Sequence, residues 1–499
     1  MIPSSAPGAR LGLIDLAAKR IGGMVIAAND EYFAAKENLL DPAPPRFDPA
    51  RYSDRGKEMD GWETRRRRDD GNDWCVVRLG IAGVLEEVAV DTTYFRGNYP
   101  DEFSLEGCVI DAAAPGPDTD WFTLVGRTHL QGDTLQRFPV EAPWQVTHVR
   151  LSIYPDGGVA RLRLLGRPLV DLHTSVGAGD RLDLAASVSG GRAVACSDDF
   201  FSSPNNLVSV GDARDMGDGW ETRRRRGPGE DFAIIELTTS GVIERVEIDT
   251  THFKGNYPDR CAIDTIHVPG ADADDLPDDG WVEVVEPSPM EPHARHVFDV
   301  VAATPASHLR LRVIPDGGVA RLRAFGTITE DGWIRAGLAV LNARTPSVAA
   351  GLLLRCCGSS AWAAGMAARR PFRDPTELGR VADELWAALG TADHLEAFAA
   401  HPRIGERSAA RWSSQEQAGA AASDTATLDA LAEANRVYED RFGHVFLIFA
   451  TGKSATEMLS ALEERLGNDA ATELRIAAEE QRKITRLRLD KLLRDGIPD

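Results

Sequence analysis

Apolar and polar residues alternate in short runs from about residue 15 to about residue 330, with clusters of Gly, Pro and Asp between the runs. A period of two residues predicts β-strands. The clearest runs are WCVVRLGIAGVLEEVAVDT (74–92), FAIIELTTSGVIERVEIDT (232–250), HVRLSIYPDGGVARLRLLG (148–166) and HLRLRVIPDGGVARLRAFG (308–326). Pro-Asp-Gly-Gly in the last two predicts a tight hairpin turn between two strands. Many short strands at regular spacing favour a sandwich or jelly roll over a parallel α/β sheet.

The pattern changes near Thr327–Trp333, and from Ile334 onward apolar residues recur at helical spacing among Ala, Glu and Arg. DPTELGRVADELWAAL, SATEMLSALEERLG and DAATELRIAAEEQRKITRLRLDKLL each predict an amphipathic helix. Asp374, which precedes a proline, and Ser454 are predicted N-caps of the first two. The last third of the chain is therefore expected to be all-α, after a short join.

Blocks of sequence that recur in the same order indicate two copies of one domain. DGWETRRRR at 60–68 returns unchanged at 218–226, an offset of 218 − 60 = 158 residues. Three more blocks recur: GGMVIAANDEYF (22–33) as GGRAVACSDDFF (190–201), DTTYFRGNYPD (91–101) as DTTHFKGNYPD (249–259), and PDGGVARLR (155–163 and 315–323). We expect a multidomain chain of two tandem all-β jelly-roll repeats, residues 1–175 and 176–328, followed by an all-α helical domain at 334–499.

Composition narrows the class of partner. The 499 residues carry a net charge of −21, which argues against a nucleic acid or an anionic membrane as partner. The six cysteines show no metal-ligand spacing and do not recur between the copies, so we expect reduced thiols. The N-terminus lacks a signal-peptide pattern and no apolar run could cross a bilayer, so a cytoplasmic location is expected.

The arginine runs are the first candidate site. On a strand, four consecutive arginines would alternate faces, so Arg65 and Arg67, or Arg223 and Arg225 in the second copy, could point inward together. Guanidinium groups bind carboxylate or ureido oxygens bidentately, and Glu63 or Glu221 would remain for proton transfer. The alternative is a solvated strand surface, which is what most charge runs form.

The DTT blocks are the second candidate. In the second copy Asp249, His252 and Asn256 bring a carboxylate, an imidazole and an amide within a few residues, whereas the first copy has Tyr94 in place of the histidine. Ordinary turn chemistry after a strand explains the same letters. If only one copy is catalytic, the second is favoured.

Together these duplicated blocks resemble the allantoicase family over roughly residues 10–330. The resemblance implies jelly-roll modules like galactose-binding domains, and hydrolysis of allantoate to ureidoglycolate and urea. Arginines would bind the substrate carboxylate, hydrogen bonds would hold its two ureido groups, and an acid must protonate the departing urea. From the residues alone we expect Glu221, Asp249 and His252 to be catalytic, with a divalent metal held by these three as an alternative.

The helical third has its own candidate site in FAAHPRIGERSAARWSSQEQAGA (398–420). Taken by itself, His401 could cap a helix and Ser413 with Glu416 could form a capping box. That account leaves unexplained why polar groups accompany the apolar run RFGHVFLIFATG (441–452), which could line a pocket.

RRPF, HPRIG, SSQEQ, RFGHVFLIFA and ITRLRL in this third resemble 2-oxo-4-hydroxy-4-carboxy-5-ureidoimidazoline (OHCU) decarboxylases, over about residues 335–495. That family is all-helical, needs no cofactor and forms (S)-allantoin. Position by position, the resemblance implies catalytic roles for His401, Glu416 and Arg488, and substrate contacts for Ser413, Gln417 and Pro402. His444 and Val445 depart from the family pattern, which puts the wall of the pocket in doubt.

The favoured hypothesis is a bifunctional enzyme of urate catabolism. Its two reactions are not consecutive, because an allantoin-opening hydrolase must act between them. We expect small ureido substrates, no nucleic-acid or membrane partner, and a homo-oligomer. The rival hypothesis is a jelly-roll ligand-binding or scaffold protein in which only the helical decarboxylase is active. It predicts aromatic platforms and calcium-type loops, whereas the copied blocks are rich in arginine and acids.

Overall fold

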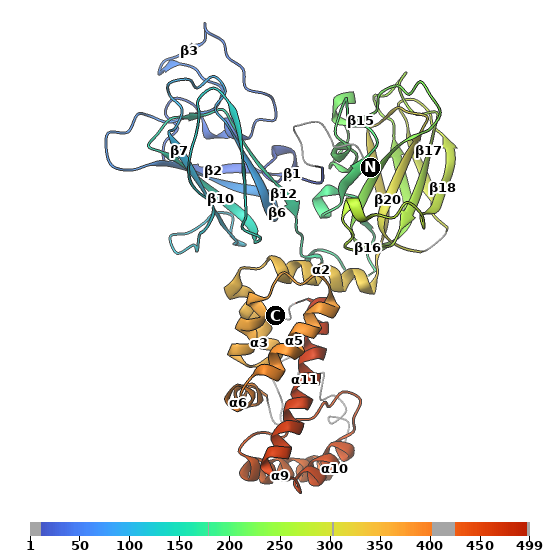
Figure 1. The fold of residues 1–499 in the computed structure, drawn as a ribbon. Coiled ribbons are helices and arrows are strands. Elements are labelled where there is room, and N and C mark those ends of the chain that lie inside the picture. The colour runs from blue at the N-terminus through green and yellow to red at the C-terminus, as the bar shows by residue number, and fades with distance from the viewer. Residues whose placement is uncertain (1–10, 178, 302–303, 402–424, 497–499) are drawn as a thin grey trace. The chain divides into compact units, whose positions relative to one another are not determined.

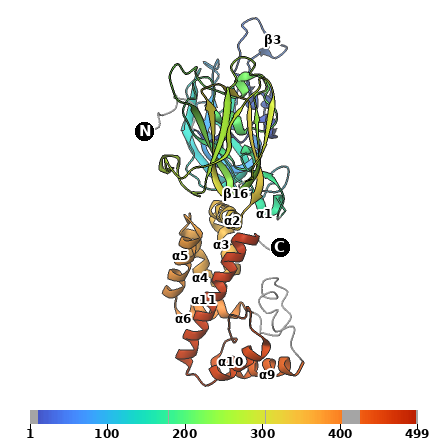
Figure 2. The same ribbon diagram turned by 90° about the vertical axis from the view of Figure 1, so that its right-hand side faces the viewer.

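A computed structural model describes residues 11–177, 179–301, 304–401 and 425–496. The chain forms two compact units, Met1–Gly332 and Trp333–Asp499. The first holds two β-sandwiches and the second is helical (Figures 1 and 2). The prediction of two all-β jelly-roll repeats followed by an all-α domain is confirmed. Within the described residues, none of the helices has the length and apolar character needed to cross a bilayer.

Each repeat is organised around one 19-residue strand, β6 (Asp73–Asp91) in the first. The first half of β6 pairs with β2 (Met24–Ala28) and β10 (Gln145–Tyr154). Its second half pairs with β9 and β12, so the strand runs through both layers of the sandwich. The remaining strands of this sheet are β1 (Ile14–Asp15), β7 (Glu102–Cys108), β8 (Phe122–His129), β9 (Leu135–Pro139) and β12 (Arg161–Pro168).

The second repeat follows the same plan around β16 (Asp231–Asp249). β16 pairs with β14 and β20 in its first half and with β19 and β22 in its second half. Its other strands are β13 (Leu182–Asp183), β14 (Arg192–Cys196), β17 (Arg260–Ile266), β18 (Val282–Pro289), β19 (Arg295–Asp299), β20 (Pro305–Ile314) and β22 (Arg321–Ile328).

The predicted hairpin at Pro-Asp-Gly-Gly is wrong. β10 and β12 flank this sequence but do not pair with each other, because β6 lies between them in the sheet. Instead Gly158 and Val159 form β11, which pairs with β5 (Trp62–Glu63). In the second repeat β21 (Gly318–Val319) pairs with β15 (Trp220–Glu221) in the same way. In each repeat the Pro-Asp-Gly-Gly loop is therefore paired with the copied Trp-Glu motif.

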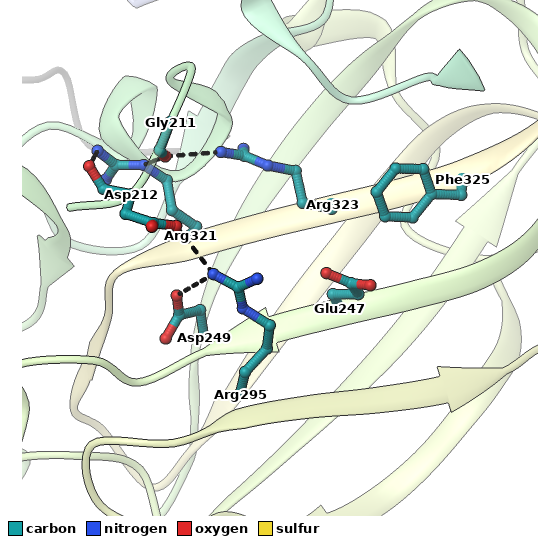
Figure 3. Close-up of a pocket in the computed structure, with 8 residues that line it drawn as sticks. All are labelled: Gly211, Asp212, Glu247, Asp249, Arg295, Arg321, Arg323 and Phe325. Carbon is teal, nitrogen blue, oxygen red and sulfur yellow. Dashed lines mark hydrogen bonds and ion pairs between the residues drawn. The ribbon is translucent and has the colours of Figure 1, made fainter.

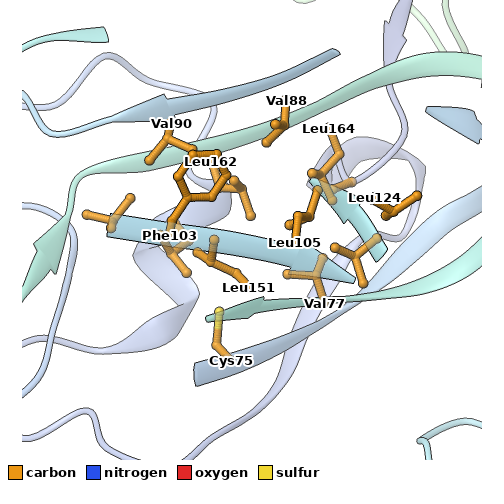
Figure 4. Close-up of a cluster of buried hydrophobic side chains, with 14 of the residues drawn as sticks. Cys75, Val77, Val88, Val90, Phe103, Leu105, Leu124, Leu151, Leu162 and Leu164 are labelled. Atoms are coloured by element: carbon orange, nitrogen blue, oxygen red, sulfur yellow. The ribbon is translucent and has the colours of Figure 1, made fainter. Parts of the chain in front are cut away.

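The alternating apolar positions form the interior of each sandwich. In the first repeat Val77, Val88, Leu105 and Leu151 lie in one cluster (Figure 4), and all four are fully buried. Burying such a side chain contributes about 1.5–3 kcal/mol, so the alternation itself accounts for much of the driving force. The six cysteines are free and buried, and none forms a disulfide.

The helical unit has two hydrophobic clusters, and α11 (Ala470–Asp495) runs past the helices of both (Figures 1 and 2). The two predicted N-caps are confirmed. Asp374 accepts a bond from the Glu377 N–H, and Ser454 forms a capping box with Glu457. The other described helices are α2 (Glu330–Ala343), α3 (Pro346–Cys357), α4 (Ser360–Ala368), α5 (Pro375–Ala388), α6 (Thr391–Ala399), α9 (Thr425–Phe442) and α10 (Ala455–Arg465).

Candidate active sites

Each β repeat holds a copied glutamate–asparagine pair at one end of its sandwich. Asn98 Nδ2 donates to Glu63 Oε1 over 2.7 Å, and Asn256 Nδ2 donates to Glu221 Oε1 over 2.6 Å. Burial raises the pKa of Glu63, and the bond from Asn98 offsets part of that effect. The structure therefore brings Asn256 of the DTT block to Glu221 of the other block, in both copies alike.

The turn after each DTT sequence is held in an uncommon conformation. Tyr94 has φ 72° and its counterpart His252 has φ 74°, the left-handed region that non-glycine residues rarely adopt. His252 Nε2 bonds to the Ala213 carbonyl at 2.9 Å, and its backbone N–H donates to His293 Nδ1 at 2.8 Å. His252 thus contacts a neighbouring loop.

The arginine runs do not lie on strands, so the predicted alternation of faces is wrong. β5 and β15 end at the glutamate, and the four arginines follow in an irregular loop. Arg65 is 64% exposed and bonds to Asp30 at 2.7 Å, and its counterpart Arg223 is 63% exposed and bonds to Asp198. A polar run carries no apolar period to place it in a sheet.

Arg67 and Arg225 are half-buried and bind acids of their own repeats. Arg67 donates to Asp73 at 2.7 Å, and Arg225 makes the same contact with Asp231. Both aspartates are buried at the start of the long strand. These two arginines therefore neutralise structural carboxylates.

The expected metal ligands do not come together. Glu221, Asp249 and His252 are all described, and no group of three His, Cys, Asp or Glu in the described chain could hold a metal ion. Asp249 instead accepts a bond from the Thr251 N–H at 2.8 Å, as a turn-capping aspartate does. This donor set does not fit a divalent metal.

A polar pocket of about 210 Å³ opens on the outer face of the second repeat (Figure 3). Glu247 and Asp249 on β16 lie opposite Arg323 and Arg321 on β22, so side chains of one face meet across the strand pair. The pocket is lined by Gly211, Asp212, Glu247, Asp249, Arg295, Arg321, Arg323 and Phe325. Of the residues expected to be catalytic, Asp249 lines it.

The charged side chains of the pocket differ in how many hydrogen bonds and ion pairs they already form within the protein. Arg321 is buried and donates to the carbonyls of Gly211 and Asp218, so its position is set by the fold. The Arg295 guanidinium lies between Asp212 and Asp249, at 2.9 and 3.5 Å (Figure 3). The Glu247 side chain forms no hydrogen bond or ion pair within the described residues, so its carboxylate is available to a ligand.

The first repeat lacks two of the charges that line this pocket. Strand register places Asp91 opposite Leu135, where the second repeat has Asp249 opposite Arg295. It likewise places Ala89 opposite Arg163, where the second has Glu247 opposite Arg323. Arg295 and Glu247 therefore distinguish the second copy. Comparison of the copies at the level of strand pairing was the signal that could have found them.

The helical unit brings together His401 and Arg488, two of its predicted site residues. Burial and the nearby charge of Arg488 lower the pKa of His401 to about 3, and the Gln481 side chain opposes this shift. His401 Nε2 and Gln481 Oε1 are buried and have no hydrogen-bond partner within the described residues. Gln481 and Arg488 lie seven residues apart on α11, hence on one face. The other predicted residues, Pro402, Ser413, Glu416 and Gln417, lie outside the described residues.

The chain matches two family models and several relatives named as probable allantoicases. Residues 14–169 and 182–329 match the allantoicase repeat, and residues 342–490 match OHCU decarboxylase. A probable allantoicase of Pseudomonas aeruginosa strain UCBPP-PA14 is 46% identical over 63% of this chain and 96% of its own length. Probable allantoicase 2 of Burkholderia pseudomallei strain K96243 is 43% identical over 66% of this chain and 98% of its own.

A crystal structure of allantoicase from Saccharomyces cerevisiae is 33% identical, with a TM-score of 0.53, over 63% of this chain and 93% of that one. A second solved allantoicase gives 33% identity and a TM-score of 0.54 over 63% of this chain and 94% of that one. The chain belongs to the allantoicase family and carries an OHCU decarboxylase domain after its two allantoicase repeats.

Proposed function

We propose that this enzyme catalyses two reactions of urate catabolism, one in each unit. The β unit hydrolyses allantoate to ureidoglycolate and urea. The helical unit decarboxylates OHCU to (S)-allantoin. Family membership supports both activities. The observation that supports the site of allantoate hydrolysis is the polar pocket of the second repeat.

The pocket matches the chemistry of allantoate, a carboxylate with two ureido groups on one carbon. Arg295 offers its guanidinium group to the carboxylate, and Glu247 can accept ureido N–H bonds. Hydrolysis forms a bond from water oxygen to the central carbon and breaks one carbon–nitrogen bond. The water loses a proton and the departing urea gains one. Glu247 and Asp249 are two pocket carboxylates that can serve these transfers.

Exchanging residues between the copies tests this site with little risk to folding. Arg295→Leu and Glu247→Ala each install the residue that the first repeat carries in the same register. We expect either change to lower kcat/KM for urea release from allantoate by about 10- to 100-fold, the effect of losing a charge-assisted bond. Arg137→Val, which installs the second repeat's residue in the first, is the matched control and should retain full activity.

The urea assay also decides between the rival hypotheses. Urea at background in the wild-type protein, with EDTA and with added Mn²⁺ alike, would leave the β unit as a scaffold. Equal activity of Arg295→Leu, Glu247→Ala and wild type would place the reaction outside this pocket. Within the described residues Glu221, Asp249 and His252 do not converge, so these three do not form a metal site.

In the helical unit we assign proton transfer to His401 and charge stabilisation to Arg488. Decarboxylation breaks a carbon–carbon bond and leaves an electron pair on the ring. A proton then adds to the carbon that carries this pair. A guanidinium beside that position stabilises the developing charge. A neutral imidazole can accept and return a proton.

His401→Ala should abolish enzyme-dependent formation of optically active allantoin from freshly oxidised urate, and His394→Ala on α6 is a control outside this pair. Optical rotation that develops at the wild-type rate in His401→Ala would exclude this role.

We also propose that the enzyme acts in the cytoplasm as a homo-oligomer on small ureido molecules. Its net charge of −21 supports the absence of nucleic-acid partners. Size-exclusion chromatography with light scattering tests the oligomer, and a monomer at micromolar concentration would contradict it.

A further inference from the structure

One edge of the second-repeat pocket is a segment that we call the roof segment, residues 205–212. Gly211 and Asp212 line the pocket directly. Arg323 donates to the Ser209 carbonyl at 2.6 Å, and Arg321 donates to the Gly211 carbonyl at 3.0 Å. The roof segment is thus bonded to two of the arginines that line the pocket.

The first repeat holds the roof segment through its own residues. Gly12 N–H donates to Asn205 Oδ1 at 3.2 Å, and Asn205 Nδ2 donates back to the Leu13 carbonyl at 3.3 Å. Arg20 donates to Ser209 Oγ at 3.1 Å. Contacts from both repeats therefore meet on one short segment.

Arg20 is also linked to the pocket arginine Arg321 through a shared carboxylate. Arg20 lies 3.4 Å from Asp218 Oδ1, while Arg321 lies 3.1 Å from Asp218 Oδ2. Asp218 and Arg321 are both buried. The Arg20 side chain is 45% exposed. Partial burial lowers its pKa, and the Asp218 carboxylate opposes that shift. Arg20 is therefore inside the electrostatic environment of the pocket.

The contact of Arg20 with Asp218 has no counterpart in the described part of the first repeat. In the first repeat the matching pair is Asp60 with Arg161, and Asp60 accepts its further bond from the Arg46 backbone N–H. The second repeat has Val188 at the position of Arg20, 168 residues on, the offset of the first copied block. The turn tolerates valine there, so the arginine is not required by the local fold.

We propose that Arg20 is a positioning residue for the allantoate site: from the first repeat it holds Ser209 and Asp218, so that the roof segment and Arg321 keep the geometry that binds substrate. The first repeat thereby completes a site that lies in the second. This inference depends on the proposed allantoate hydrolysis in the second-repeat pocket.

Arg20→Val tests the inference, since it installs the second repeat's own residue. We expect KM for allantoate to rise about tenfold with kcat little changed, because displaced contacts weaken binding more than chemistry. Backbone amide exchange over residues 205–212, measured without substrate, should speed up in the same variant. Lys19→Ser, the matching exchange at the exposed neighbouring position, should leave both quantities unchanged.

The two readouts separate failure of the inference from failure of the function. An unchanged KM in Arg20→Val overturns the inference while allantoate hydrolysis stands. A raised KM with unchanged exchange over 205–212 also overturns it, because positioning is then not the route. If wild type releases no urea, the proposed function fails, and the pocket role of Arg20 fails with it.

Discussion

Single side chains in this protein acquire their roles from the charges beside them. Arg67 and Arg225 meet buried aspartates, so these arginines stabilise the fold. Arg295 meets two partly satisfied aspartates at the rim of a pocket, so it can bind a ligand. Identical residue types thus separate into structural and binding groups by burial and by the number of partners.

His401 should remain uncharged throughout the working range of the decarboxylase. Its pKa is lowered to about 3, because burial and Arg488 both disfavour the imidazolium. ¹⁵N NMR of histidine-labelled protein between pH 5 and 8 should show an imidazole that does not titrate and whose signal is absent from His401→Asn. A resonance assigned to His401 with a midpoint near its ordinary value of 6.5 would contradict this environment.

Glu63 should make the stability of the β unit depend on pH. Burial raises its pKa in the folded state above the ordinary 4.5. At a pH between the ordinary and the raised pKa, the folded state therefore binds more protons than the unfolded state. Its stabilising contribution is complete below the ordinary pKa and is lost as pH rises through the raised value. Between pH 4 and 7, Glu63→Gln should therefore lose less stability than wild type. Parallel unfolding curves for the two proteins would show that the shift is absent.

At the scale of elements, the spacing of apolar residues predicted strands and helices correctly, whereas polar stretches of sequence did not predict their structure. The alternating run 74–92 became the strand β6, and the caps at Asp374 and Ser454 began their helices. The predicted faces of the Arg65–Arg68 run are wrong because the run does not lie on a strand. The predicted Pro-Asp-Gly-Gly hairpin is wrong because residues far along the chain decide the pairing of this loop. Arg295 and Glu247 were missed for the same reason, since register between β16, β19 and β22 brings them together.

A buried ion pair ties α10 to α11 in the helical unit. Arg465 Nε donates to Glu473 at 2.8 Å, and the Glu473 side chain is fully buried. Arg465→Met should lower the free energy of unfolding by about 3 kcal/mol, because it leaves a buried carboxylate without its counterion. Arg436→Met, which removes an exposed pair with Glu433 on α9, should cost less than about 1 kcal/mol. Urea denaturation compares them, and equal costs would refute the importance of burial.

At the scale of the whole molecule, duplication supplied a scaffold whose copies then diverged. Both repeats keep the glutamate–asparagine pair and the arginine–aspartate pairs. The second alone has Glu247 and Arg295 in the matching register, and the first contributes Arg20. The helical unit has its own hydrophobic clusters and its own site, so changes in one unit should leave the other activity intact.

Hydrolysis of allantoate in the second repeat can be tested with one pair of variants. Asp249→Asn alters the pocket, whereas Asp91→Asn alters the matching aspartate of the first repeat, which caps the Thr93 N–H in the same way. We predict that Asp249→Asn lowers kcat/KM for urea release at least about 100-fold, the scale of a lost acid–base group, while Asp91→Asn retains wild-type activity. Allantoin formation by the same preparations should be unchanged in both. Loss of urea release in Asp91→Asn with full activity in Asp249→Asn would place allantoate hydrolysis in the first repeat instead.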